Sequence, residues 1–202
     1  MSESQFMIYM VCQWILAVGT IALAIVALWG HIIRSRWLGP RLCISLRSEN
    51  GERSEFGDGV MSRYYHIRVF NRRRSAPAHN VRIVLKSLFR PMANGEMSPT
   101  ALSGPLQMAW QFQGSNPQFQ TIGAESVCDL GYLRQDSDFT LSMLYHHFSF
   151  TPTVSANQRI IATFVALSDE TESNELRIEI AWDGLWNEDS DEMRQHLVVR
   201  AI

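Results

Sequence analysis

Three consecutive arginines, Arg72, Arg73 and Arg74, have the type and spacing that most clearly allow chemistry in this 202-residue chain. They lie at the predicted tip of a hairpin, whose two strands carry Arg63 and Arg82. Guanidinium groups bind phosphate through paired hydrogen bonds, so the cluster could hold a nucleotide or a lipid headgroup. The alternative is a solvated turn whose charges discourage strand pairing. No glycine-rich phosphate loop or stacking motif accompanies it, and nucleic acid is not an expected partner.

The acidic segment 182–193 is the second candidate, because its carboxylates could supply oxygen ligands to calcium. Their spacing does not match the Asp-x-Asp-x-Asp-Gly loop with a distal glutamate. In the structural alternative, Asp183 and Gly184 form a turn after a buried Trp182, and Asp189 or Ser190 caps a short helix. We expect the structural role and no metal.

The remaining polar residues predict no catalytic site. His146 and His147 are adjacent, so in a strand they point to opposite faces and cannot bind one metal. The other histidines have no partner at helical spacing, and the sequence contains no GxSxG, GxxxxGK[ST] or HExxH motif. We therefore expect neither an enzyme nor a bound cofactor.

Residues 6–33 form a run of 28 positions without Asp, Glu, Lys or Arg, longer than the ~20 apolar residues that cross a bilayer as a helix. A cleaved signal peptide is the alternative, with residues 22–24 resembling a cleavage site. The run is too long for a signal peptide and lacks a basic start. It therefore predicts a retained transmembrane helix, with the lipid bilayer as its first partner.

The flanks of this run predict its orientation. Basic residues near a membrane favour the cytoplasmic side, and tryptophans favour the headgroup level. The expected interface residues follow the run or end it: Trp29, Arg34, Arg36, Trp37 and Arg41. The prediction is a single-pass protein of the inner, cytoplasmic membrane with its N-terminus outside. Its parts are a tail (1–5), the membrane helix (6–33), a basic linker (34–40) and a cytoplasmic domain (41–202).

One side of the expected helix is suited to association. Thr20, Ala24 and Ala27 put small residues on this side, with Gln13 two turns earlier. Small residues let helices approach closely, and a polar side chain in hydrocarbon is costly without a partner. The face could therefore contact a second copy of the chain or another membrane protein.

After the linker, apolar residues recur with period two, as in Tyr65, Ile67 and Val69, which is typical of strands with one buried face. Nine such segments alternate with turn-forming residues: 41–48, 65–70, 81–86, 107–113, 126–133, 139–148, 159–168, 177–182 and 196–201. No helical interval repeats between them. The pattern predicts an all-β domain, an antiparallel sandwich of about eight or nine strands. Residues 91–105 and 186–192 are expected loops.

The segment YYHIRVFNRRRSAPAHNVRIVL, residues 64–85, resembles immunoglobulin-like bacterial modules of the CARDB kind. In those modules a strand ending in Asn leads through a short Ser/Ala/Pro turn into an Ala-x-Asn-Val strand. The resemblance covers about 22 of the 202 residues. It implies an immunoglobulin-like sandwich and nothing about function.

The charges separate along the chain. Residues 31–90 contain 13 Lys and Arg against 4 Asp and Glu, and residues 91–202 contain 5 against 15. The two halves either compensate across the folded surface or form a basic and an acidic face.

Cys43 and Cys128 are expected to be free thiols in a reducing cytoplasm. A disulfide between them is the alternative if the domain faces an oxidising compartment.

Together these patterns predict a membrane-anchored protein-interaction or scaffolding module, with a protein partner or a homo-oligomer. The alternative is a sensor whose arginine cluster binds a nucleotide or phosphorylated ligand and signals through an oligomeric membrane helix.

Overall fold

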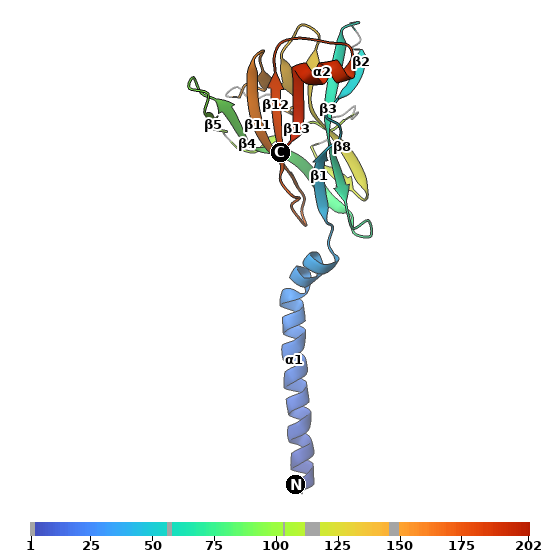
Figure 1. Cartoon of the computed structure of the whole chain (residues 1–202). Helices are drawn as coiled ribbons and strands as arrows, with labels where there is room; N and C mark the ends of the chain where they lie inside the picture. Colours follow the sequence, from blue (N-terminus) through green and yellow to red (C-terminus); the bar gives the residue numbers. More distant parts are fainter. Residues whose placement is uncertain (1–2, 56–57, 103, 112–117, 146–149) are drawn as a thin grey trace. The chain divides into compact units, whose positions relative to one another are not determined.

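The computed structural model describes residues 3–55, 58–102, 104–111, 118–145 and 150–202, with only the backbone at residues 28 and 31–37. These residues form two helices and thirteen strands. The chain divides into two compact units, Met1–Gly39 and Pro40–Ile202 (Figure 1). The second unit is called the β-domain below.

The first unit is one helix, α1 (Glu3–Leu38). Its stretch Glu3–Ala27 has 25 residues and a mean hydropathy of 2.2, so it is long and apolar enough to cross a membrane. Large apolar side chains along it are exposed, as Leu16 (73%) and Leu23 (72%) illustrate. The expected linker 34–40 is helical as far as Leu38, because positions 34–38 contain no Gly or Pro and the first of these in the linker are Gly39 and Pro40.

The first sheet of the β-domain is antiparallel, with the order β1-β3-β8-β9-β10 and with β2 paired to β3. Its strands are β1 (Leu42–Leu46), β2 (Glu52–Glu55), β3 (Met61–Asn71), β8 (Glu125–Arg134), β9 (Phe139–Leu141) and β10 (Thr153–Val154).

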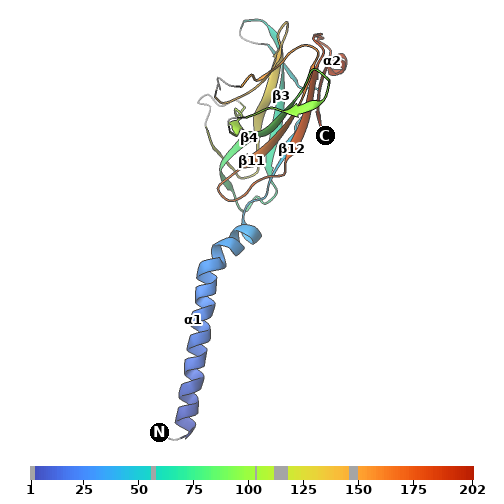
Figure 2. The same ribbon diagram turned by 90° about the vertical axis from the view of Figure 1, so that its left-hand side faces the viewer.

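The second sheet is also antiparallel, with the order β13-β12-β11-β4-β5 and with β6 and β7 paired to β4 (Figures 1 and 2). Its strands are β13 (Leu197–Ala201), β12 (Leu176–Trp182), β11 (Gln158–Leu167), β4 (Ala78–Pro91), β5 (Met97–Pro99), β6 (Leu106–Gln107) and β7 (Gln120–Ile122). A short helix, α2 (Ser190–His196), precedes β13.

Both sheets contribute to one hydrophobic core. Ile67 and Val69 of β3 are fully buried, and so are Ile83 and Leu85 of β4. The predicted alternation of buried and outward residues is therefore confirmed in these strands, and the expectation of an all-β domain with antiparallel sheets holds.

The strand count exceeds the predicted eight or nine, because β2, β5, β6, β7 and β10 have only two to four residues each and carry little periodic signal. In its described part, the predicted strand 107–113 comprises the end of β6 at Gln107 and two isolated bridges, at Met108 and Trp110. The predicted strand 139–148 ends at Leu141, and its positions 146–148 lie outside the described residues. The predicted loop 91–105 contains β5.

The expected hairpin around the three arginines is wrong. β3 pairs with β1, β2 and β8, whereas β4 pairs with strands of the other sheet. The turn therefore connects the two sheets. Sequence periodicity identifies both strands but does not select their partners, which depend on contacts far along the chain.

Gly51 lies in the turn before β2, where its close packing predicts a large loss of stability on substitution. Its φ is +68°, and a Cβ there would lie 2.8 Å from Arg63 Cγ and 2.9 Å from Tyr65 Cζ. We expect Gly51→Ala to lower the free energy of unfolding by ~3 kcal/mol, from left-handed strain plus overpacking. Urea denaturation followed by tryptophan fluorescence measures it.

Gly95→Ala is the matched control, because Gly95 has a φ of +82° and a Cβ there would have no neighbouring atom within 4 Å. This substitution should lower the free energy of unfolding by the left-handed strain alone, ~1 kcal/mol. Equal losses in the two variants would contradict the close packing at Gly51.

Candidate functional site

Asn71, at the end of β3, organises the turn of Arg72, Arg73 and Arg74, which is called the arginine turn below. The Asn71 side chain is buried; its Oδ1 accepts the backbone N–H groups of Arg41 and Arg73, each at 3.0 Å. Its Nδ2 donates to Ala76 O at 2.7 Å. The Arg72 N–H also bonds to Arg41 O at 2.9 Å. The turn is thus tied to Arg41, three residues after the end of α1.

Phe70 links the turn to the neighbouring strand. The guanidinium carbons of Arg68 and Arg72 lie 5.3 and 5.9 Å from the centre of its ring. Arg68 also forms a two-bond ion pair with Glu125, and its hydrogen bond lowers the pKa of that carboxyl. Arg72 and Arg74 are exposed. The turn is therefore a basic surface held by a packed backbone, a geometry that can accept phosphate.

Arg63 lies elsewhere, although the sequence grouped it with the arginine turn. It is fully buried, and its Nη1 donates to Asn50 O at 3.0 Å and Ser190 Oγ at 2.9 Å. Its Nη2 donates to Glu188 O at 3.1 Å. Arg63 therefore joins β3 to the loop before α2 and presents no charge to a ligand. Arg82, on β4, lies over the Phe119 ring at 5.8 Å.

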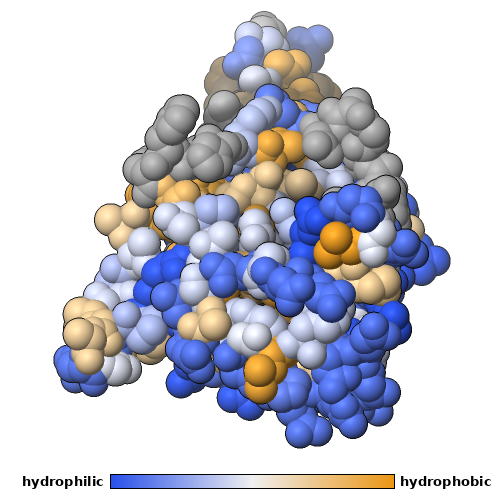
Figure 3. Space-filling model, turned by 90° about the horizontal axis from the view of Figure 1, so that it is seen from above, coloured by the Kyte–Doolittle hydropathy of each residue, from blue (hydrophilic) through white to orange (hydrophobic). Residues whose placement is uncertain are grey.

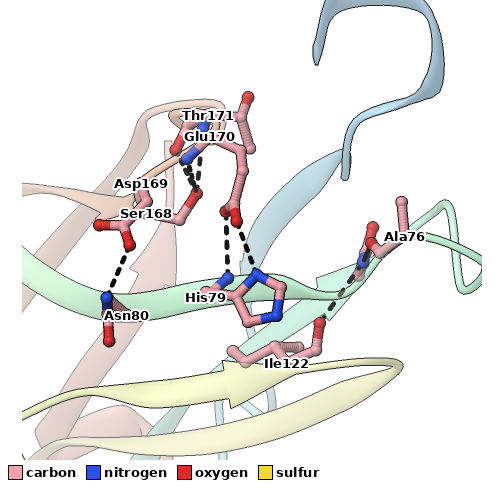
Figure 4. Close-up of polar contacts among 9 residues, drawn as sticks. Ala76, His79, Asn80, Ile122, Ser168, Asp169, Glu170 and Thr171 are labelled. Atoms are coloured by element: carbon pink, nitrogen blue, oxygen red, sulfur yellow. Dashed lines mark hydrogen bonds and ion pairs between the residues drawn. The ribbon is translucent and has the colours of Figure 1, made fainter. Parts of the chain in front are cut away.

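The start of β4 faces the turn between β11 and β12 (Figure 4). His79 Nδ1 lies 2.7 Å from Glu170 Oε1, and the His79 N–H donates to Glu170 Oε2 at 3.0 Å. Asn80 Nδ2 donates to Asp169 Oδ2 at 2.6 Å. Burial opposes ionisation of Glu170, but the bonds from His79 outweigh it and lower the pKa of the carboxyl. These bonds hold the start of β4 against the turn between β11 and β12.

The lowered pKa of Glu170 predicts acid sensitivity. Its contribution to stability is present above the ordinary value of 4.5 and is lost as pH falls through the lower folded pKa. We expect Glu170→Gln to lower the free energy of unfolding by ~1 kcal/mol near neutral pH. As the pH falls further, the variant should lose less of its stability than the wild type. Urea midpoints from about pH 3 to about pH 7 test this. Glu172→Gln, on the same connection, should keep the wild-type acid response; an unchanged response in Glu170→Gln would contradict the assignment.

The expected membrane-interface residues are only partly described. Trp29 and Arg41 are exposed. The side chains of Arg34, Arg36 and Trp37 lie outside the described residues.

The expected helix-association residues, Gln13, Thr20, Ala24 and Ala27, are all exposed on α1. Gln13 Nε2 donates to Tyr9 Oη at 2.8 Å, and Thr20 Oγ1 donates to Leu16 O at 2.8 Å. Each polar group thus has a partner one turn earlier in its own helix, which lowers the cost of placing it in hydrocarbon. Association through this face stays a prediction.

Ion pairs join the basic and acidic halves of the sequence across the folded surface. The pairs that cross between residues 31–90 and residues 91–202 include Arg53–Glu188, Arg68–Glu125, Lys86–Glu175, Arg134–Asp58 and Arg194–Glu49. In the first three pairs a basic residue of 31–90 meets an acidic residue of 91–202, so the excess charges of the two halves compensate locally there. This favours the first of the two interpretations that the charge pattern allowed.

The acidic segment 182–193 has the structural role that its sequence predicted. Asp189 is the N-cap of α2, and its side chain accepts the N–H groups of Asp191 and Glu192. Trp182 is buried at the end of β12. Among the described residues, no group of three or more His, Cys, Asp and Glu side chains could hold a metal ion.

Sequence reasoning missed a polar site on the outer face of the first sheet, around His66. His66 is 4% exposed, and its Nδ1 lies 2.9 Å from Asp129 Oδ1. Its Nε2 lies 3.2 Å from Gln111 Nε2 and 3.5 Å from Glu52 Oε2. Asp129 thus lies against one ring nitrogen of His66, and Gln111 and Glu52 lie against the other.

A β-bulge creates this contact. Tyr65 pairs with Gly131 and His66 with Asp129, so Leu130 is an extra residue in β8. Directly opposite residues of antiparallel strands point to the same face. The bulge therefore turns the Asp129 carboxylate toward the His66 ring while Leu130 stays in the core.

Beside His66 lies a cavity of about 420 Å³, called the His66 cavity below. It is lined by Glu52, Arg53, Ser54, Tyr64, His66, Gln111 and Asp129. This volume lies in the range of small-molecule sites.

Tyr64 and Cys128 define the chemistry near the cavity. Burial raises the pKa of Tyr64, with Tyr132 and Asp129 adding to the effect, so its phenol is neutral. Burial also raises the pKa of Cys128 well above its ordinary value, and its Sγ donates to Ala109 O at 3.0 Å. Cys128 is therefore no thiolate nucleophile for this site, and the cavity is suited to binding through hydrogen bonds.

No protein-family model and no curated protein matches this chain. The resemblance of residues 64–85 to CARDB modules therefore stays a prediction from the sequence. The assignment of function depends on the geometry described above.

Proposed function

We propose that this chain is a single-pass membrane protein whose β-domain is a protein-interaction module on the cytoplasmic side of the membrane. The observation that carries the proposal is α1. Its 25-residue apolar stretch exposes large side chains throughout, and such a surface needs lipid or another apolar environment. The stretch is also longer than the apolar centre of a signal peptide, which supports a retained anchor.

The flanking charges support the orientation. Arg34, Arg36 and Arg41 follow the apolar stretch, whereas Glu3, its first residue, is the charged side chain at its other end. Basic residues next to a span favour the cytoplasmic side. Two antiparallel sheets that share one core support an immunoglobulin-like sandwich as the fold of the module.

The surface of the β-domain supports an interaction role through polar contacts. Seen from above, it is largely hydrophilic, with hydrophobic residues in small separate patches (Figure 3). Among the described residues of the β-domain, the exposed large apolar side chains are far apart in sequence: Met92, Phe119, Tyr145, Leu185 and Ile202. Such a surface suits reversible association.

Affinity purification of the full-length chain in mild detergent, with mass spectrometry and light scattering, tests this function. Residues 40–202 are purified in parallel as the matched control. A stoichiometric protein partner held by both would support the interaction module. A partner held only by the full chain would assign the contact to α1. A monomer without a partner in both would contradict the proposal.

The arginine turn favours a second candidate function, a sensor of a nucleotide or phosphorylated ligand. Three adjacent guanidinium groups lie on a turn that Asn71 holds against Arg41. Arg41 lies three residues after the end of α1, so a change in the turn on ligand binding would be transmitted to the membrane helix along this short segment of chain. The sensor would signal as an oligomer.

Equilibrium binding of a radiolabelled nucleoside triphosphate to the full chain tests the sensor. Saturable binding should fall at least about tenfold when Arg72, Arg73 and Arg74 are all changed to Ala, because charge-assisted bonds to phosphate are lost. Arg194→Ala, a surface arginine paired with Glu49, is the control. Binding that survives the triple change would exclude the arginine turn as the sensor.

A further inference from the structure

The His66 cavity presents hydrogen-bond acceptors of negative charge. Asp129 lies on one side of the imidazole and Glu52 on the other, at 2.9 Å and 3.5 Å from the two ring nitrogens. One imidazole can offset at most one of the two carboxylate charges. The site therefore favours a ligand that brings positive charge and hydrogen-bond donors.

The two arginines near the cavity do not reverse this preference. Arg53 Nη2 bonds to Glu188 Oε2 at 3.0 Å, so its charge already has a carboxylate partner. Arg47 Nε lies 3.2 Å from Glu52 Oε1 and offsets part of the charge of Glu52. Asp129, 22% exposed at its side chain, has His66 as its ion-pair partner among the described residues. An anion would meet the Asp129 carboxylate without a free guanidinium opposite.

Aromatic rings add to the preference for a cation. Tyr64 lines the cavity and stacks parallel to His66, with ring centres 6.4 Å apart and an interplanar angle of 4°. Tyr132 follows in the same row, 5.6 Å from Tyr64. The faces of tyrosine rings attract ammonium and guanidinium groups. Carboxylates and aromatic faces on one cavity wall thus select the same class of ligand.

The site is built before any ligand arrives. The buried His66 ring is held at both of its nitrogens, and the bulge at Leu130 fixes the position of Asp129. Little side-chain freedom remains to be lost on binding, which favours affinity.

We propose that the His66 cavity binds a small organic cation, an ammonium or guanidinium group on a short carbon chain, with Asp129 and Glu52 as its acceptors. The cation enters beside the Tyr64 ring, and His66 holds Asp129 in place. The residues that line this site all belong to the β-domain and include none of the arginine turn.

Equilibrium binding of radiolabelled agmatine to the full chain in phosphatidylcholine nanodiscs tests the proposal. We expect saturable binding that 1,4-diaminobutane displaces and that succinate and butane-1,4-diol, with the same four-carbon chain, do not. Asp129→Asn keeps the shape of the side chain and should weaken binding at least about tenfold, since a charge-assisted hydrogen bond becomes neutral. Glu125→Gln, on the same strand outside the cavity, should bind as the wild type.

Glu52→Gln provides a second variant on the exposed strand β2, where folding is less at risk, and it should also weaken binding. Three results would overturn the proposal: no saturable binding to the wild type, equal binding in both cavity variants and wild type, or displacement by succinate as effective as that by 1,4-diaminobutane.

Discussion

Arg63→Ala is expected to lower the free energy of unfolding of the β-domain by ~3 kcal/mol or more. The substitution removes the charged donor of Asn50 O and Glu188 O from two partly buried hydrogen bonds, and hydrogen bonds to a charged group contribute ~1.5 to 3 kcal/mol each. It also leaves a cavity in place of the fully buried Arg63 side chain. Urea denaturation of the full chain in detergent, followed by tryptophan fluorescence, measures the change.

Arg53→Ala is the matched control, because Arg53 and Arg63 both bind Glu188. Arg53 contacts the carboxylate at the surface, whereas Arg63 contacts the backbone carbonyl. A surface ion pair contributes at most ~1 kcal/mol, so the control should be nearly neutral. Arg63→Lys keeps a charge but loses the fork of the guanidinium, and should fall between the two. Equal stability of the two alanine variants would contradict the structural role of Arg63.

The second large effect is expected in α1. Ile15→Arg combined with Val18→Arg places two charges near the middle of the stretch Glu3–Ala27. Both positions lie on the helix side opposite Gln13 and Thr20, so the change leaves the expected association face intact. Each arginine costs ~3 kcal/mol at the centre of a membrane helix, against ~0.3 to 0.6 kcal/mol gained per large apolar residue.

We therefore expect the double variant to be extracted from membranes by alkaline carbonate, while the wild type stays in the pellet. Ile15→Leu with Val18→Leu is the control and should behave as the wild type. Retention of the double-arginine variant in the pellet would mean that α1 does not hold the chain in the membrane.

Local patterns in the sequence predicted the elements well. The charge-free run indicated α1, the period-two pattern of Tyr65, Ile67 and Val69 indicated a strand with a buried face, and Asp189 was a predicted helix cap. These features depend on neighbours within a few residues. Burial of an apolar face and capping of a helix are therefore readable without knowledge of the fold.

Contacts between distant residues were not predictable. Arg63 carries a charge that sequence patterns place at the surface, and its burial depends on Glu188 and Ser190, more than 120 positions later. His66 and Asp129 are 63 residues apart, and they meet because Leu130 forms a bulge. No sequence signal indicated the burial of Arg63 or the contact of His66 with Asp129, because strand pairing and register are set by the assembled sheets.

Labelling of single introduced cysteines with a membrane-impermeant maleimide in intact cells tests the central claim most directly. The chain would carry Ser4→Cys, before the apolar run, or Ala93→Cys, in the exposed turn between β4 and β5, and the parent with its native cysteines gives the background. A cytoplasmic β-domain predicts labelling of Ser4→Cys in intact cells and of Ala93→Cys only after the membrane is opened. Labelling of Ala93→Cys in intact cells would contradict a β-domain held on the cytoplasmic side.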